Sequence, residues 1–200
     1  MEKLILPKIT EISGDIHLPG SKSISNRALL LSALAEGPAN ISNLLESNDV
    51  NHMCDALKQM GFNLVRNLEK RTATFDGAGG PLPAGDFDLY LENAGTAVRS
   101  MTAALCLGKG TYRVDGNERM RERPIKHLTD ALKPLGAKIT HEINEGFLPL
   151  TIEADGLEGG TTEVEGGVSS QYLTALLIAA PYAKNDVTIK VIGELTSKPY

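Results

Sequence analysis

Apolar residues recur three and four positions apart in several segments, and glycine-rich turns separate these segments from short runs of β-branched residues. This spacing places apolar side chains on one face of a helix, so helices are predicted over 27–36, 50–57 and 97–107. Gly61 and Gly136 suit the position just past a helix end, where the backbone turns left-handed. The strands predicted from the β-branched runs cover 40–44, 62–65, 72–75, 111–115, 137–141, 149–153 and 187–192.

The chain repeats itself along its length. Segments 55–64 and 130–139 share the residues DALK and a glycine three positions after the lysine. A third copy begins at Ser170, where 174–179 resembles 102–107. Each copy contains a helix, a strand, a second helix and further strands, which predicts an α/β fold with mixed parallel and antiparallel sheets.

The repeats are expected over approximately 19–93, 94–168 and 169–200, with the third incomplete. Pro199 corresponds to Pro124, and in the second copy a helix follows that proline. The repeat therefore predicts that at least a helix and two strands are missing from the third copy. The alternative is a natural 200-residue protein that ends on a loop.

Composition narrows the class of protein. Apolar residues make up 42 % and charged residues 22 % of the 200 residues, as in ordinary globular proteins. No apolar run reaches the roughly 18 residues of a membrane span, and the N-terminus lacks a signal-peptide layout, so a cytoplasmic protein is expected. Cys54 and Cys106 lie in apolar helical patterns, which favours buried reduced thiols over a disulfide or a catalytic role.

The segment 18–27, which reads LPGSKSISNR, carries the clearest chemical signal. A Pro-Gly turn leads into small polar residues with Lys22 and Arg27, and an apolar helix follows. Unpaired N–H groups and a partial positive charge at a helix start attract phosphate. The chain's net charge is −5, so a local cationic site indicates a specific anionic ligand.

Two further helix starts carry small polar residues, at 93–97 and at 169–171. Each alone is explained by capping, because Ser, Thr and Asn are favoured N-caps. Capping explains less well why cations flank the first start and why Ser169, Ser170 and Gln171 open the third. We expect the three helix starts to converge on one cleft and to form a set of donors for an anion.

A second basic cluster contains Arg119, Arg121 and Arg123. Such a cluster is often a solvated loop. Arg123, however, precedes a proline that restricts the local backbone, and a guanidinium held in this way suits phosphate or carboxylate. The scattered histidines give no metal-site spacing, and no P-loop or dinucleotide motif is present, so neither a metal nor a cofactor is expected. The lack of a Lys/Arg tract argues against nucleic acid as a partner.

Five motifs together resemble the 5-enolpyruvylshikimate-3-phosphate synthase family: those of 18–27, 93–97, 119–124, 169–171 and 197–200. The resemblance covers about the first half of the family's usual length. It implies a fold of two similar domains, each built from three copies of one α/β unit in an inside-out barrel. Residues 1–18 are expected to pack with the second domain, and 19–200 to form the shikimate-phosphate-binding domain of a monomeric protein.

The resemblance also implies an activity and a set of residues. The family transfers the enolpyruvyl group of phosphoenolpyruvate to the 5-hydroxyl of shikimate 3-phosphate and releases phosphate, in chorismate and aromatic amino acid biosynthesis. Lys22 and Arg123 are implied as catalytic, since they would offset two anions and stabilise the addition intermediate. The implied substrate-binding residues are Lys22, Ser23, Arg27, Gly95, Thr96, Arg123, Ser169, Ser170, Gln171, Ser197 and Tyr200.

The chain departs from the family pattern in three respects. Ser100 stands where the family often has proline, and Glu92 where glycine is common. The family's proton-transferring aspartate, glutamate and lysine lie beyond 1–200, so the isolated chain is expected to be inactive. Two alternatives are a UDP-sugar enolpyruvyl transferase, although 113–123 lacks that enzyme's reactive cysteine, and a non-catalytic anion-binding fragment.

Overall fold

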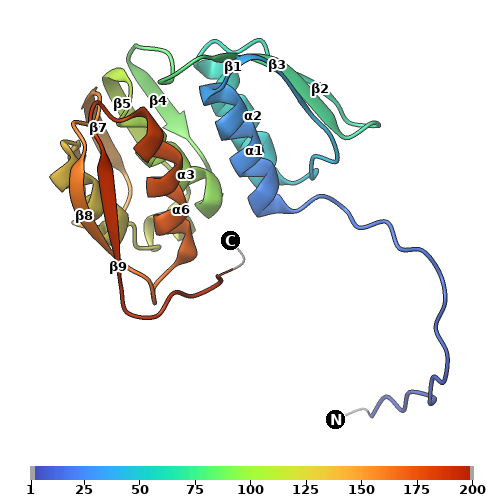
Figure 1. Cartoon of the computed structure of the whole chain (residues 1–200). Coiled ribbons are helices and arrows are strands. Elements are labelled where there is room, and N and C mark those ends of the chain that lie inside the picture. Colours follow the sequence, from blue (N-terminus) through green and yellow to red (C-terminus); the bar gives the residue numbers. More distant parts are fainter. Residues whose placement is uncertain (1–2, 199–200) are drawn as a thin grey trace.

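The computed structural model describes residues 3–198 and consists of helices packed against three small sheets (Figure 1). In chain order the main elements are α1 (Lys22–Leu34), β1 (Glu36–Ile41), α2 (Asn48–Gln59), β2 (Val65–Asn67), β3 (Thr72–Ala78), β4 (Phe87–Tyr90), α3 (Gly95–Leu105), β5 (Lys109–Asp115), α4 (Glu118–Arg121), α5 (Lys126–Leu132), β6 (Lys138–His141), β7 (Leu150–Asp155), β8 (Gly160–Glu165), α6 (Ser170–Ala179) and β9 (Val187–Ile192). Two 3₁₀ turns, Lys133–Leu135 and Ala180–Tyr182, follow α5 and α6.

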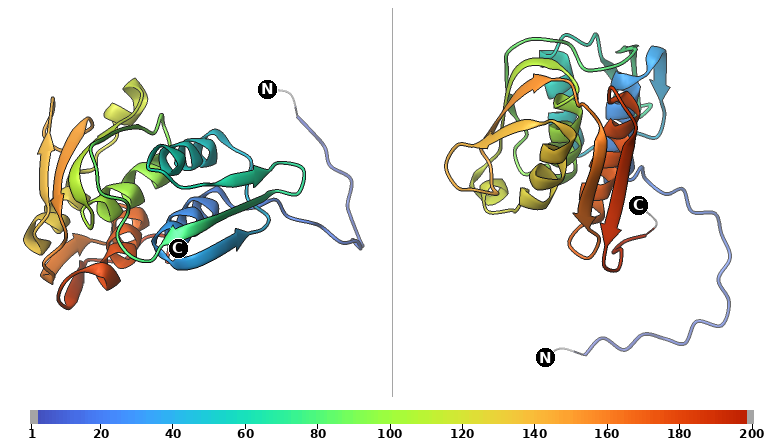
Figure 2. Two further views of the ribbon diagram at one scale, coloured as in Figure 1. Left: turned by 90° about the horizontal axis from the view of Figure 1, so that it is seen from above. Right: turned by 60° about the vertical axis from the view of Figure 1, so that its left-hand side comes forward.

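The three sheets confirm the mixed α/β class. The first has the order β1-β3-β2 and is antiparallel. The second has the order β4-β5-β7-β6, with β4 parallel to β5 and the other pairs antiparallel. In the third, β8 and β9 run parallel and lie side by side (Figure 2). Strand β4, which the repeat places at the end of the first copy, is hydrogen-bonded into the second sheet.

Helix α3 lies at the centre of the core. Every one of its eleven residues is buried, and it contacts α1, α2, α5 and α6. Its sequence explains this position, because a helix that is small and apolar on nearly all sides has no face suited to water. The four polar residues of the helix are buried as well, so α3 brings polar groups into the core; these residues are Thr96, Arg99, Ser100 and Thr102.

The observed boundaries of all three predicted helices differ from the sequence expectations, and α2 (Asn48–Gln59) is two residues longer at each end than the predicted 50–57. Helix α1 begins at Lys22 and ends at Leu34, earlier at both ends than the predicted 27–36. Gly37, the residue that follows the predicted helix, does not end it but lies inside β1 with φ of +83°. Helix α3 likewise begins and ends two residues earlier than 97–107. The left-handed glycines Gly61 and Gly136 are confirmed, with φ of +97° and +101°.

The predicted strands match the structure unequally: 72–75, 111–115, 137–141 and 149–153 overlap β3, β5, β6 and β7, whereas 40–44 and 62–65 reach only the ends of β1 and β2. Strand β9 coincides with the predicted 187–192.

Cys54 and Cys106 are buried and form no disulfide with each other, and burial raises the pKa of Cys54 to about 11 and of Cys106 to about 12. Within residues 3–198, no helix has the length and apolar character needed to cross a membrane.

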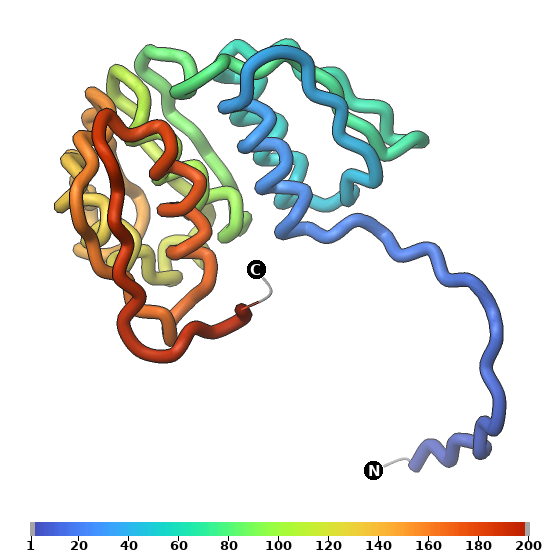
Figure 3. Tube along the Cα trace, in the orientation of Figure 1, coloured from blue at the N-terminus to red at the C-terminus, as the bar shows by residue number. Residues whose placement is uncertain are grey.

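Residues 3–19 run away from the packed body before α1 begins (Figure 3). They contain no helix or strand. Their apolar side chains, including Ile9, Ile12 and Ile16, are exposed. The packed structure that positions the candidate site therefore starts at Gly20.

Candidate functional site

A cavity of about 420 Å³ lies where the helices α1, α3 and α6 begin. These three starts are at the same end of the molecule, the lower end in Figure 1. The expected convergence of the helix starts is therefore present. The residues that line the cavity are Lys22, Ser23, Asn48, Asp49, His52, Glu92, Asn93, Ala94, Gly95, Thr96, Arg123 and Gln171.

The start of α1 is held by its preceding turn. A Cβ on Gly20 would lie 2.0 Å from the carbonyl oxygen of Asn43, so only glycine allows this close approach of two backbone segments. One turn later, the backbone N–H of Leu45 donates to the buried Ser25 Oγ at 3.0 Å. These contacts hold the first turn of α1 in place and so fix the position of the backbone that carries Lys22 and Ser23.

The start of α3 brings Arg123 to the cavity. A Cβ on Gly95 would lie 2.4 Å from Arg123 Nη2, so the guanidinium rests directly against the glycine backbone. Arg123 Nη1 also donates to Asn93, at 3.2 Å to the carbonyl and 3.1 Å to Oδ1. The glycine is required here because any side chain would displace this cation.

Capping differs among the three helix starts. Ser169 caps α6, because its Oγ accepts a hydrogen bond from the Gln171 N–H at 3.2 Å. Within residues 3–198, neither Ser21 before α1 nor Ala94 before α3 makes a side-chain capping bond. Capping therefore accounts for the serine at α6. At α1 and α3 no side-chain cap competes with an anion for the N–H groups of the first turn, although the Gly95 N–H itself donates to the Asn93 carbonyl at 2.9 Å.

The cavity contains cations and carboxylates together. Lys22 Nζ forms an ion pair with Asp49 Oδ2 at 3.2 Å. Glu92 adopts a left-handed φ of +50°, and its carboxylate accepts two hydrogen bonds from Asn117 Nδ2, at 2.9 and 3.0 Å. No carboxylate lies within ion-pair distance of Arg123 in the described part of the chain. Arg123 is thus the cation of the cavity whose charge a bound anion would balance.

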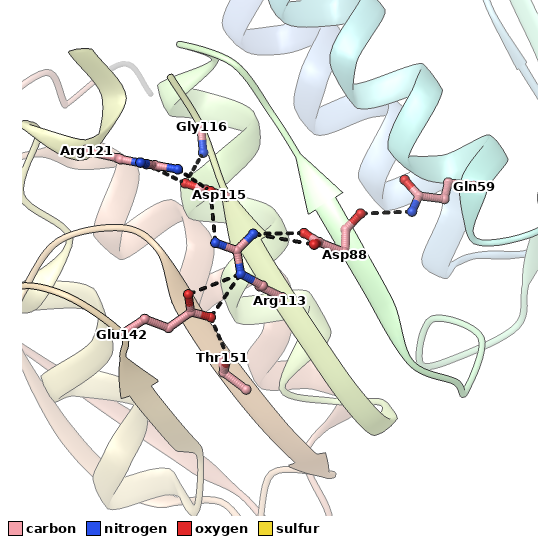
Figure 4. A network of polar contacts seen from close by, with 8 residues as sticks. All are labelled: Gln59, Asp88, Arg113, Asp115, Gly116, Arg121, Glu142 and Thr151. Atoms are coloured by element: carbon pink, nitrogen blue, oxygen red, sulfur yellow. Dashed lines mark hydrogen bonds and ion pairs between the residues drawn. The ribbon is translucent and has the colours of Figure 1, made fainter. Parts of the chain in front are cut away.

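The other arginines of the basic cluster have different surroundings. The buried carboxylate of Asp115 binds Arg121, with Arg121 Nη2 at 2.6 Å and Nε at 2.9 Å, and Arg113 Nη2 at 3.0 Å (Figure 4). Burial opposes ionisation of Asp115, but hydrogen bonds from Arg121, Gly116 and Arg113 outweigh it, so the pKa of this carboxyl lies below its ordinary value. Arg119 is exposed, but it lies in the short helix α4 and not in a solvated loop.

A network of ion pairs connects Asp115 with neighbouring strands of the second sheet. Arg113 Nη1 contacts Asp88 at 3.1 Å and Arg113 Nε contacts Glu142 at 3.0 Å, so one guanidinium joins β4, β5 and the turn after β6 (Figure 4). These contacts fix strand β5 and the loop that follows it. Arg123 is carried by the same stretch of chain, after the short helix α4.

The structure does not bring every predicted site residue into the cavity. Six line it, namely Lys22, Ser23, Gly95, Thr96, Arg123 and Gln171. Arg27 lies one turn further along α1, Ser169 and Ser170 flank the start of α6 outside the lining, and Ser197 is exposed in the segment after β9. Tyr200 lies outside the described residues.

Sequence reasoning missed several cavity residues. Asn48, Asp49 and His52 belong to the first turns of α2, whose start at Ser47 is another polar helix start. That polar start is a signal that could have pointed to them. Glu92 was noted only as a departure from the family. Sequence reasoning also gave no role to Arg99, which does not line the cavity but is 6 % exposed and bonds to Gln171.

The Ser100 departure leaves the first turn of α3 intact. Its Oγ donates to the carbonyl of Thr96 at 2.8 Å, so the hydroxyl is satisfied inside the helix. Thr96 still lines the cavity, and α3 still begins at Gly95.

A second cavity, of about 450 Å³, lies between α5 and β8. Its lining includes Asp130, Glu163 and Glu165 but no lysine or arginine among the described residues. An anionic ligand is therefore favoured at the helix starts and not here. No group of three or more His, Cys, Asp or Glu side chains in residues 3–198 is arranged to hold a metal ion.

Comparisons with known proteins show to which family the chain belongs. The family model described as EPSP synthase (3-phosphoshikimate 1-carboxyvinyltransferase) matches residues 6–200. Proteins named 3-phosphoshikimate 1-carboxyvinyltransferase are 54 % identical to the chain in Sulfurovum sp. and 52 % identical in Photobacterium damsela, each over 201 residues. Both matches cover 100 % of this chain and 47 % of the relative, so the chain spans about half the length of the curated relatives it matches.

A solved structure shares the fold. The EPSP synthase of Acinetobacter baumannii superposes with a TM-score of 0.82 at 25 % sequence identity. The match covers 92 % of this chain and 41 % of that one. The mixed sheets and helices described above therefore correspond to part of a larger molecule of that kind.

Proposed function

The chain belongs to the EPSP synthase family, and from this premise we propose that it is the half of an enolpyruvyl transferase that binds shikimate 3-phosphate. The complete reaction joins C2 of phosphoenolpyruvate to the 5-hydroxyl oxygen of shikimate 3-phosphate, then expels phosphate from the adduct. The observation that carries the proposal is the single cavity shared by the starts of α1, α3 and α6, with Lys22 and Arg123 beside it. The names of the relatives support this activity over the UDP-sugar alternative.

Each side of the cavity suits one part of this chemistry. On the α1 and α6 sides, Ser23 and Gln171 offer uncharged donors to the hydroxyls and phosphate of the ring substrate. On the α3 side, the guanidinium of Arg123 lies against Gly95 and suits bidentate binding of the phosphate or carboxylate of phosphoenolpyruvate. Lys22 would contact both substrates, since its flexible side chain gives one charge to two neighbouring anions.

Catalysis by these residues is electrostatic and positional. Two anions repel each other, and fixed cations hold them at reacting distance while charge develops on the leaving phosphate. When shikimate 3-phosphate arrives, Lys22 exchanges its contact with Asp49 for one with the ligand. In this proposal the proton transfers belong to the second half of the protein.

The remaining assignments follow the same proposal. Ser169, Ser170, Arg27, Ser197 and Tyr200 contact shikimate 3-phosphate once the second half closes over the cavity. Residues 1–18 pack with that half, and 19–200 form the substrate domain of about three repeats. The full-length protein is a cytoplasmic monomer.

The proposal is tested by calorimetric titration of shikimate 3-phosphate and by a phosphate-release assay with and without the complementary C-terminal half. We expect the chain alone to bind shikimate 3-phosphate and to release no phosphate from the substrate pair, and the mixed halves to release it. Lys22→Ala should abolish binding, whereas Lys138→Ala, an exposed lysine on β6, should leave it unchanged. Phosphate release by the chain alone would contradict the division of roles, and absence of binding would contradict the site.

A further inference from the structure

Arg99, in the second turn of α3, is a buried cation without a carboxylate partner in residues 3–198. Its side chain makes two hydrogen bonds, from Nη1 to Gln171 Oε1 at 2.6 Å and from Nη2 to the carbonyl of Pro124 at 3.2 Å. A buried cation that lacks an opposite charge destabilises a fold. Its position in the central helix therefore calls for an explanation other than packing.

The neighbouring groups fix the orientation of this guanidinium. Its central carbon lies 5.3 Å from the centre of the Tyr172 ring, within the range of a cation–π contact. The Tyr172 hydroxyl donates to the same Pro124 carbonyl at 2.7 Å. Burial lowers the pKa of Arg99, the contact with Tyr172 opposes this shift, and the positive charge of the nearby Arg123 adds to it.

The bond from Arg99 determines which way the Gln171 amide faces. Because Oε1 accepts from the guanidinium, Nε2 is on the other side of the amide, where it donates to Thr96 Oγ1 at 3.4 Å. The reverse orientation would place two donors against each other. One hydrogen of Nε2 is directed to Thr96, and the second is left for an acceptor in the cavity that Gln171 lines.

We propose that Arg99 is a positioning residue of this site, which orients the Gln171 amide so that Nε2 donates to a phosphorylated ligand. Through the Pro124 carbonyl, Arg99 also ties that amide to the chain segment that carries Arg123. The identity of the ligand rests on the proposed function. The orientation of the Gln171 amide in the free protein does not depend on that function.

The first arm of the test needs no ligand. In the ¹⁵N-labelled 200-residue chain, the side-chain NH₂ signals of Gln171 are assigned from their loss in Gln171→Leu, and their hydrogen exchange is measured. We expect Arg99→Met to speed this exchange about 10-fold, the loss of one charge-assisted hydrogen bond, and Arg99→Lys to restore part of the protection. Arg66→Met is the matched control, because Arg66 Nη1 donates to Asn51 Oδ1 at the same 2.6 Å but away from the cavity.

The second arm measures shikimate 3-phosphate binding by calorimetry in Arg99→Met, Gln171→Leu and the double variant. If Arg99 acts through Gln171, its replacement weakens binding about 10-fold alone and adds nothing in the Gln171→Leu background. Unchanged Gln171 signals in Arg99→Met, or additive losses of affinity, would overturn the proposal. Should Arg99→Met unfold, Arg99→Lys decides on the same readouts. A wild-type chain that does not bind, but whose Gln171 signals respond to Arg99→Met, refutes the proposed function and leaves the positioning role in place.

Discussion

Asp115→Asn is the substitution for which the structure predicts the largest effect on the arginine-rich segment 116–123. The side chain of Asp115 is 6 % exposed and accepts hydrogen bonds from Arg113, Arg121 and the Gly116 N–H (Figure 4). Asparagine keeps the shape of the side chain. It removes the charge and turns an NH₂ group toward one of the guanidinium groups.

The expected loss of stability lies between two limits. Breaking a fully buried pair destabilises by about 3–5 kcal/mol, whereas an exposed pair contributes about 0.2–1 kcal/mol. Asp115 is buried, but the side chains of Arg113 and Arg121 are 34 % and 41 % exposed and recover hydration when the bond is lost. We therefore expect Asp115→Asn to lower the free energy of unfolding by about 2–3 kcal/mol.

Urea unfolding followed by circular dichroism measures this loss. Asp88→Asn is the matched control, because Asp88 binds the same Arg113 but is 66 % exposed, and its loss should stay below about 1 kcal/mol. The pKa of the folded Asp115 lies below the unfolded value, so its contribution is complete above the unfolded pKa and disappears as the pH falls through the folded one. Equal losses in the two variants, or a loss in Asp115→Asn that persists unchanged at low pH, would refute this reasoning.

Three further predictions concern the cavity and the thiols. Gly95→Ala should displace Arg123 and weaken the binding of shikimate 3-phosphate at least about 10-fold. The melting temperature should stay that of the wild type, because the added methyl group clashes with the end of a flexible side chain. Binding equal to that of the wild type would contradict the contact. Glu92→Gln keeps an acceptor for Asn117 but removes a negative charge from the cavity. Calorimetry should therefore show an affinity for shikimate 3-phosphate that is about 5-fold higher, equivalent to about 1 kcal/mol. An unchanged or lower affinity would contradict this prediction. Cys54 and Cys106 should resist a thiol reagent at pH 8 in the folded chain and react in urea, because burial raises both pKa values to about 11 and 12; rapid labelling without denaturant would show that one is accessible.

The helix starts could be predicted because each carries its own local signal. At α1, small polar residues precede an apolar periodic segment, and the repeat places similar residues before α3 and α6. The exact boundaries were less well predicted: α1 begins five residues before the predicted 27 and ends two residues before 36, and α3 is displaced by two residues at both ends. A glycine after an apolar run marks a terminator at Gly136, but at Gly37 it allows a left-handed residue inside a strand.

The rest of the cavity depends on tertiary packing. Asp49 and His52 reach it because α2 packs against α1 and α3, a contact that no local pattern encodes. Arg99 occupies a polar position in an apolar helix and would ordinarily be assigned to a solvent-facing side. It is buried because α3 is surrounded by other helices, and this environment turns its guanidinium toward Gln171.

Chemical-shift mapping of the ¹⁵N-labelled chain with shikimate 3-phosphate tests most directly whether the helix starts act as one site. Backbone amides at Ser23 and Thr96 and the side chain of Gln171 should shift together, with one shared saturation curve, and the Arg123 Nε signal should follow them. Shifts confined to a single helix start, or curves with separate midpoints, would show that these groups do not hold one ligand.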